Sequence, residues 1–77
     1  MQDQERADRT MGKTRRGGLP APTNYHRQPT LGDGSPCDGC GESIHPTDIQ
    51  FAVSFFAGDL NWRFHDVCFE AWSSVKP

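Results

Sequence analysis

Apolar side chains are scarce in this chain, and no long apolar run is present. Only 34% of its 77 residues are apolar, whereas about 45–50% is typical of a soluble globular domain. A membrane-spanning helix needs about 20 mainly apolar residues, but the longest apolar stretch, residues 51–57, is interrupted by Ser54. The first twenty residues also lack the apolar segment of a secretory signal. We therefore expect no membrane span and a location in the cytoplasm, or in the nucleus if the source is eukaryotic.

The shortage of apolar residues is concentrated in the first half of the chain. Residues 1–36 contain seven apolar residues, and residues 37–77 contain nineteen. Glycine and proline recur from residue 17 to residue 36 and interrupt every window long enough for a helix or strand. So few apolar side chains cannot offset the entropy that is lost when a chain becomes ordered. We predict a disordered N-terminal tail over residues 1–36 and a single folded module over residues 37–77.

Neither half of the chain has a strong excess of positive charge. The formal net charge is +2 over residues 1–36 and −4 over residues 37–77, so the second half has no general attraction to nucleic acid. The tail contains one basic cluster, Lys13, Arg15 and Arg16. We interpret this cluster as a solvated segment. The alternative is that these three residues contact phosphate while Arg63 or an exposed aromatic residue contacts a base.

Alternating apolar residues begin after the first cysteine pair. Residues 49–55 alternate between apolar and other side chains, which is typical of a strand with one buried face. Residues 60–64 repeat the pattern. Gly58-Asp59 lies between the two segments and suits a tight turn. The sequence therefore predicts a β-hairpin.

A short helix is expected at the C-terminal end. Asp66 suits a helix cap, and residues 67–76 contain no glycine or proline. Phe69 and Trp72 lie three positions apart, so they share one helix face and are expected to pack on the hairpin. The predicted fold is a small α+β unit in which a zinc knuckle precedes the hairpin and the helix.

The three cysteines are odd in number and are not scattered. Cys37 and Cys40 form a C-x2-C pair, and after twenty-four residues His65 and Cys68 form an H-x2-C pair. Two such pairs offer the four sulfur and nitrogen ligands that Zn²⁺ takes in a tetrahedral structural site. About forty residues are also close to the size at which a domain needs a metal or a disulfide to fold. We predict that these four residues bind one zinc ion.

Other interpretations of the cysteines fit the sequence less well. An odd count without a secretory signal argues against a disulfide, and a thioredoxin-like redox pair would need a βαβ pattern. Ordinary reduced thiols and an iron site are the remaining alternatives. His45 is a rival fourth ligand, but it lies few residues after Cys40. Gly39 and Gly41 are expected to give the knuckle its backbone freedom.

A catalytic zinc site is not expected. The segment PCDGC at residues 36–40 matches the P-C-x-x-C pattern of zinc nucleoside deaminases, but the H-x-E partner is lacking: His26 is followed two positions later by Gln28. A catalytic zinc also keeps one coordination position open, whereas four protein ligands are available here. The chain is too small for an enzyme with a buried cleft, so we expect no enzymatic activity.

The two ligand pairs and their neighbours resemble a treble-clef zinc finger. The segment WRFHDVCF at residues 62–69, with the C-x2-C pair and Ile44, is similar to poly(ADP-ribose) polymerase-type zinc fingers and to the first half of a LIM domain. The resemblance covers residues 37–72 and implies a treble-clef fold with the same four zinc ligands. The positions three and six residues after Cys68, where a LIM domain has further cysteines, hold alanine and serine. The second zinc site of a LIM domain is therefore missing.

These observations lead to three functional hypotheses. We expect a monomeric, zinc-stabilised module that binds another protein, because the chain lacks room for an enzyme cleft and its second half is acidic. The first alternative is a nucleic-acid-binding zinc finger. The second is a regulator that responds to zinc or to oxidation through labile cysteines.

Overall fold

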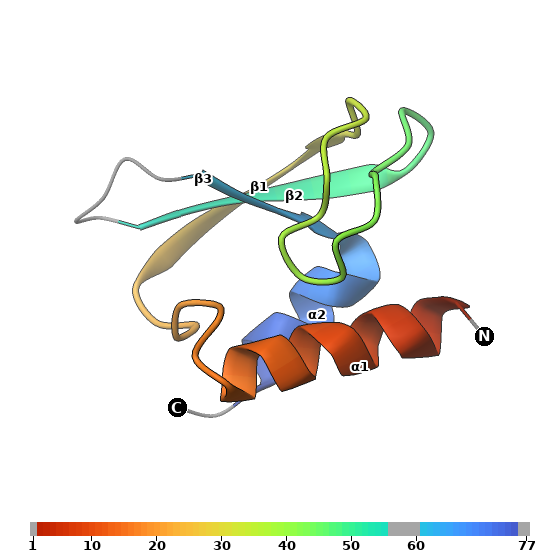
Figure 1. The fold of residues 1–77 in the computed structure, drawn as a ribbon. Helices are drawn as coiled ribbons and strands as arrows, with labels where there is room; N and C mark the ends of the chain where they lie inside the picture. Colours follow the sequence, from red (N-terminus) through yellow and green to blue (C-terminus); the bar gives the residue numbers. More distant parts are fainter. Residues whose placement is uncertain (1, 56–60, 76–77) are drawn as a thin grey trace.

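The chain forms a three-stranded antiparallel sheet with two helices, as a computed structural model of residues 2–55 and 61–75 shows (Figure 1). The elements follow in the order α1 (Gln2–Arg15), β1 (Tyr25–Leu31), β2 (Ile49–Phe55), β3 (Asn61–His65) and α2 (Asp66–Ser74). Helix α2 packs on one face of the sheet, and α1 packs on α2. The α+β class matches the prediction. No helix within the described residues is long and apolar enough to cross a membrane.

The predicted hairpin strands are present as β2 and β3. Phe51 faces Phe64 and Val53 faces Trp62 in an antiparallel register. Because side chains alternate between the two faces of a strand, these apolar residues share the side that α2 covers. The predicted turn at residues 58–59 lies outside the described residues.

The C-terminal helix begins one residue earlier than its expected cap implies. Asp66 is the first helical residue, and His65 occupies the cap position without a capping hydrogen bond from its side chain. The Asp66 carboxylate instead accepts a hydrogen bond from the Val67 N–H at 2.8 Å. Its negative charge therefore stabilises the positive end of the helix, while the His65 ring is used elsewhere.

The first half of the chain differs from the disordered tail predicted for residues 1–36. Residues 2–15 form α1, and β1 pairs with β2 over its whole length. Leu19 is buried, and the Trp72 Nε1–H donates a hydrogen bond to the Pro20 carbonyl at 2.8 Å. Composition is misleading here because six of the seven β1 residues are exposed, so β1 is held mainly through backbone hydrogen bonds to β2.

Aromatic rings form most of the core between the sheet and α2. Trp72 is fully buried and stacks on Phe64 with 5.3 Å between the ring centroids. Phe69 stacks on Phe51 at 4.7 Å. The prediction that both helix aromatics pack on the hairpin is confirmed. Tyr25 of β1 meets the Trp72 ring at 4.9 Å, which joins the first half of the chain to the same core.

Candidate metal centre

A tight loop between β1 and β2 carries the first predicted ligand pair. An isolated β-bridge closes residues 36–43, which we call the knuckle. The Cys37 N–H donates to the Glu42 carbonyl at 2.8 Å, and the Gly41 N–H donates to the Cys37 carbonyl at 2.9 Å. Gly41 has a φ of 84°, in the left-handed region that favours glycine. These bonds fix the turn from which Cys37 and Cys40 project.

The second pair lies at the junction of β3 and α2. His65 ends β3, and Cys68 lies in the first turn of α2. Residues three apart on a helix share a face, so one turn brings both side chains to the same side. His65 is 2% exposed, and Cys68 is fully buried. The structure thus brings together all four side chains that the sequence analysis selected.

The spacing of the four ligand atoms fits a single tetrahedral ion. All four atoms lie within 4.8 Å of one another. The Nδ1 atom of His65 lies 3.4 Å from the Sγ atom of Cys40 and 3.7 Å from the Sγ atom of Cys68. Zinc bonds of about 2.3 Å to sulfur and about 2.0–2.1 Å to nitrogen give a tetrahedral S···N edge of about 3.6 Å. These separations are consistent with a site for one metal ion such as zinc.

A hydrogen bond outside the cluster orients the histidine. The Nε2 atom of His65 lies 3.2 Å from the Ser43 carbonyl oxygen. Because a carbonyl only accepts, Nε2 carries the proton and donates it, which leaves the Nδ1 lone pair directed at the sulfurs. This is the tautomer that metal binding through Nδ1 requires. His45, the rival ligand, is exposed and lies outside the cluster.

The three thiols do not ionise equally without a cation. The hydrogen bond with Cys68, helped by backbone donors such as the Gly39 N–H at 3.3 Å, lowers the pKa of Cys37 to about 4. The same hydrogen bond and burial raise the pKa of Cys68, and burial raises the pKa of Cys40. Two of the sulfurs therefore retain protons, which a bound divalent ion would displace.

A polar face of α1 lies over the knuckle and the cluster. The Lys13 Nζ atom donates to the Asp38 carbonyl at 2.8 Å. The Arg6 guanidinium lies 3.6 Å from the Glu42 carboxylate, and the Arg6 carbonyl is 3.9 Å from the Cys68 Sγ atom. Three thiolates, a neutral histidine and Zn²⁺ carry a formal charge of −1. The cations of α1 are therefore placed to offset the charge of a metal-loaded centre.

The residues selected as possible nucleic-acid contacts lie partly in this interface. Lys13 is bonded to Asp38, and the Arg63 carbonyl accepts a hydrogen bond from the Asp38 N–H at 2.7 Å. Arg15 and Arg16 are exposed at the end of α1. The Lys13 ammonium group is thus already hydrogen-bonded within the protein, whereas the Arg63 side chain is exposed.

Gly39 makes room for α1, a role that differs from the backbone freedom expected of it. Its φ is not in the left-handed region. A Cβ atom at this position would meet the side chain of Thr10. Thr10 is fully buried, and its hydroxyl donates to the Arg6 carbonyl at 2.9 Å. The lack of a side chain at residue 39 therefore lets α1 approach the knuckle closely.

We expect Gly39→Ala to destabilise the metal-loaded protein by about 1–3 kcal/mol, the usual cost of overpacking. Thermal unfolding followed by circular dichroism measures the loss. Adding Thr10→Ala removes the hydroxyl and methyl groups that the new Cβ would meet, so the double variant should regain most of the stability lost through the clash. A Gly39→Ala protein as stable as the parent would contradict this packing of α1.

The contribution of α1 to the site was not predicted. Arg6, Thr10 and Lys13 are spaced four and three residues apart, so they share one helix face. Polar residues at that spacing are typical of a solvent-exposed face. Only the position of the knuckle shows that this face is covered, and the sequence holds no local signal for that position.

Comparison with protein-family models, with curated proteins and with solved structures finds no match to this chain. The candidate site therefore depends on its own geometry and donor chemistry. Four side chains from two segments converge on one point. Sulfur and imidazole donors of this kind suit zinc and other soft or borderline metal ions.

Proposed function

We propose that the chain is a structural zinc-binding module that acts as an interaction element for another protein. The observation that carries the zinc assignment is the convergence of Cys37, Cys40, His65 and Cys68 within 4.8 Å. Three sulfurs and one imidazole nitrogen match the donor set of closed structural zinc sites. Magnesium and calcium prefer oxygen donors, and mononuclear or clustered iron in sulfur-rich sites is mostly held by cysteine alone. Zinc is therefore the metal that these donors favour.

A zinc ion at this site would have a structural role. It would join the knuckle to the start of α2, two segments separated by the hairpin. Four protein ligands fill a tetrahedral coordination shell and leave no position for water or substrate. This closed donor set supports a non-catalytic role.

The order of the elements supports a treble-clef assignment. A knuckle, a hairpin and a helix follow one another, with one ligand pair in the knuckle and the other at the start of the helix. This arrangement is similar to that of poly(ADP-ribose) polymerase-type fingers and of the first zinc site of a LIM domain. Helix α1 and strand β1 would be additions to that unit.

The interaction role is favoured over the two alternatives. The Lys13 ammonium group donates a hydrogen bond to the Asp38 backbone carbonyl, and the second half of the chain is acidic, so nucleic-acid binding has less electrostatic support. Cys37 and Cys68 are at most 2% exposed, so an oxidant has access only to the half-buried Cys40. Burial of this kind favours a stable structural site over a sensor.

Metal analysis tests the zinc assignment. We expect one zinc ion per chain in protein purified without added metal, measured by elemental analysis. Replacement by Co²⁺ should give the intense visible absorption bands of a tetrahedral site with thiolate ligands. His65→Gln should weaken zinc binding by at least tenfold, because it removes one of the four ligands.

The matched control is His45→Gln, which changes the exposed histidine outside the cluster. This variant should retain one zinc ion with unchanged affinity. Purified protein with no transition metal, or equal loss of zinc in both histidine variants, would refute the proposed site.

A further inference from the structure

The two edges of the sheet are not equivalent. At the outer edge of β3, the Asp38 N–H donates to the Arg63 carbonyl at 2.7 Å, and the Arg63 N–H donates to the Asp38 carboxylate at 2.7 Å. The knuckle thus closes that edge. Strand β1 lies at the opposite edge of the sheet, and nothing in residues 2–55 and 61–75 pairs with its outer side.

The hydrogen bonds at the closed edge, together with the strand register, show which backbone groups of β1 point outward. In an antiparallel ladder, the backbone groups of alternate residues point to opposite sides. Those of Arg63 point away from β2, so its partner Ala52 directs its own groups toward β1. Ala52 faces Gln28, and the groups of the neighbouring residues Arg27 and Pro29 therefore point outward. An outward Pro29 agrees with the rule that proline in a sheet occupies a position whose N–H is not needed.

Within residues 2–55 and 61–75, the outer edge of β1 consequently has backbone groups without a hydrogen-bond partner. Arg27 presents both its N–H and its carbonyl group, and Leu31, two positions after Pro29, presents its N–H. The Leu31 side chain is 72% exposed, and its cross-strand partner Ile49 is 50% exposed. This edge combines free backbone groups with exposed apolar side chains, which is the usual requirement for pairing with another strand.

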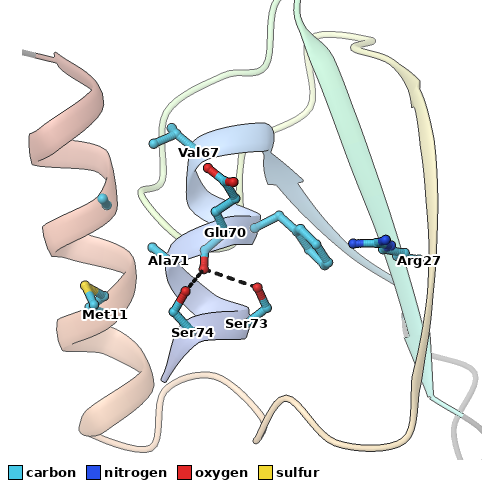
Figure 2. Close-up of a pocket in the computed structure, with 9 residues that line it drawn as sticks. Met11, Arg27, Val67, Glu70, Ala71, Ser73 and Ser74 are labelled. Atoms are coloured by element: carbon cyan, nitrogen blue, oxygen red, sulfur yellow. Dashed lines mark hydrogen bonds between the residues drawn. The ribbon is translucent and has the colours of Figure 1, made fainter. Parts of the chain in front are cut away.

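A trough lies beside this edge. Figure 2 shows Met11 of α1 on one side, Arg27 of β1 on the other, and α2 with Val67, Glu70 and Ala71 between them. The hollow has a volume of about 560 Å³. The hydroxyls of the two serines that line it donate to the Glu70 carbonyl, so they are satisfied within α2. The trough therefore presents apolar side chains together with the charged groups of Arg27 and Glu70.

The charge beside the trough indicates what would bind there. Asp66 and Glu70 are exposed, lie one helical turn apart, and form no ion pair within the described residues. A second hollow of about 260 Å³ extends between them and Phe51. The Arg27 guanidinium lines both hollows and lies over the Phe69 ring at 5.6 Å, so the two carboxylates of α2 face a single cation of β1. This excess of one negative charge beside apolar side chains favours a lysine or arginine among apolar residues of the ligand.

We propose that the outer edge of β1 and the adjoining trough bind an extended, basic segment of a partner protein. The segment adds a strand to the sheet, and its backbone bonds to Arg27 and Leu31. Every second side chain then lies over the trough, since side chains alternate along a strand. Those side chains are apolar, with a basic one opposite Asp66 or Glu70. This inference rests on the proposed role as an interaction module and identifies its binding surface.

Selection from a random dodecapeptide library displayed on phage, against the zinc-loaded full chain, tests the proposal. Selected peptides should have apolar residues at every second position and at least one lysine or arginine. In titrations with a synthetic peptide from the selection, Arg27→Pro removes the outward N–H without removing a bond to β2. It should weaken binding by about tenfold. The control Arg27→Ala keeps the N–H and should weaken binding by only about two- to threefold.

Two further measurements complement these variants. The first changes only the peptide, and the second changes one charge of the protein. Two peptides are compared, one N-methylated at its odd-numbered positions and the other at its even-numbered positions. One of them should lose binding and the other should bind almost normally, because only one set of amides faces β1. Glu70→Lys should weaken binding of the lysine peptide and strengthen binding of the same peptide with glutamate in place of lysine.

Several results would overturn the proposal. These are a library that yields no binder, binders that are indifferent to Arg27→Pro and to N-methylation, or a dimer formed through β1 in sedimentation experiments. Zinc content is measured on every sample. If the chain holds one zinc ion but binds no peptide through the β1 edge, only the proposed binding surface is refuted. If a zinc-free chain binds peptide through that edge, only the metal assignment is refuted.

Discussion

Removal of the metal is expected to unfold the chain. Structural zinc contributes an apparent folding free energy of about 10–16 kcal/mol in small finger domains, which is as large as the entire stability of about 5–15 kcal/mol of a typical domain. Here the ion would join two segments on either side of the hairpin, and α1 packs on both of them. Chelation, or Cys68→Ser, should therefore eliminate the cooperative thermal transition seen by circular dichroism and tryptophan fluorescence.

The matched control is Ser43→Ala, which changes a side chain in the same loop while keeping the carbonyl that accepts from His65. It should retain both zinc and the thermal transition. Restoring zinc to the chelated protein should restore the transition. A chelated chain that keeps its melting temperature would show that the core folds without the ion.

Trp72→Ala is expected to have the largest effect among core substitutions. Trp72 is fully buried, stacks on Phe64 and meets Tyr25 edge to face. Its indole N–H also donates a hydrogen bond to the Pro20 carbonyl. Truncation of such a side chain destabilises a protein by about 3–5 kcal/mol. Denaturant unfolding of the zinc-loaded protein measures this loss.

Two companion variants separate packing from the hydrogen bond. Trp72→Phe keeps an aromatic ring but loses the bond to Pro20, so it should cost less than Trp72→Ala and should increase hydrogen exchange in residues 17–24. Ser74→Ala changes an exposed residue of the same helix and should alter stability by about 0.5 kcal/mol or less. A Trp72→Ala protein with a loss below about 1 kcal/mol would contradict the position of Trp72 in the core.

The second half of the chain could be predicted because its signals are local. Alternation in residues 49–55 and 60–64 marked two strands, and the spacing of Phe69 and Trp72 marked the helix face that packs on them. The four candidate ligands were found for the same reason. The two members of each pair are three positions apart, and such spacing places two side chains close together within one turn of the chain.

Helix α1 and strand β1 were missed because tertiary contacts, rather than local pattern, hold them. Six of the seven β1 side chains are exposed, so the strand has no apolar period to detect and is defined by its pairing with β2. In α1, the side chains of Arg6 and Lys13 contact Glu42 and the Asp38 carbonyl of the knuckle. Such residues are indistinguishable in sequence from those of a solvated charged segment.

The contact between Asp38 and Arg63 has a consequence for assembly. A stack of sheets that grows without limit needs two adhesive sides on every copy, as in amyloid fibrils. Here one side is blocked by the knuckle, so joining through β1 ends at a pair and cannot propagate. The same few atoms that complete the loop around the cysteines thus close one edge of a sheet whose central strand contains Phe51, Val53 and Phe55, which guards against edge-to-edge growth.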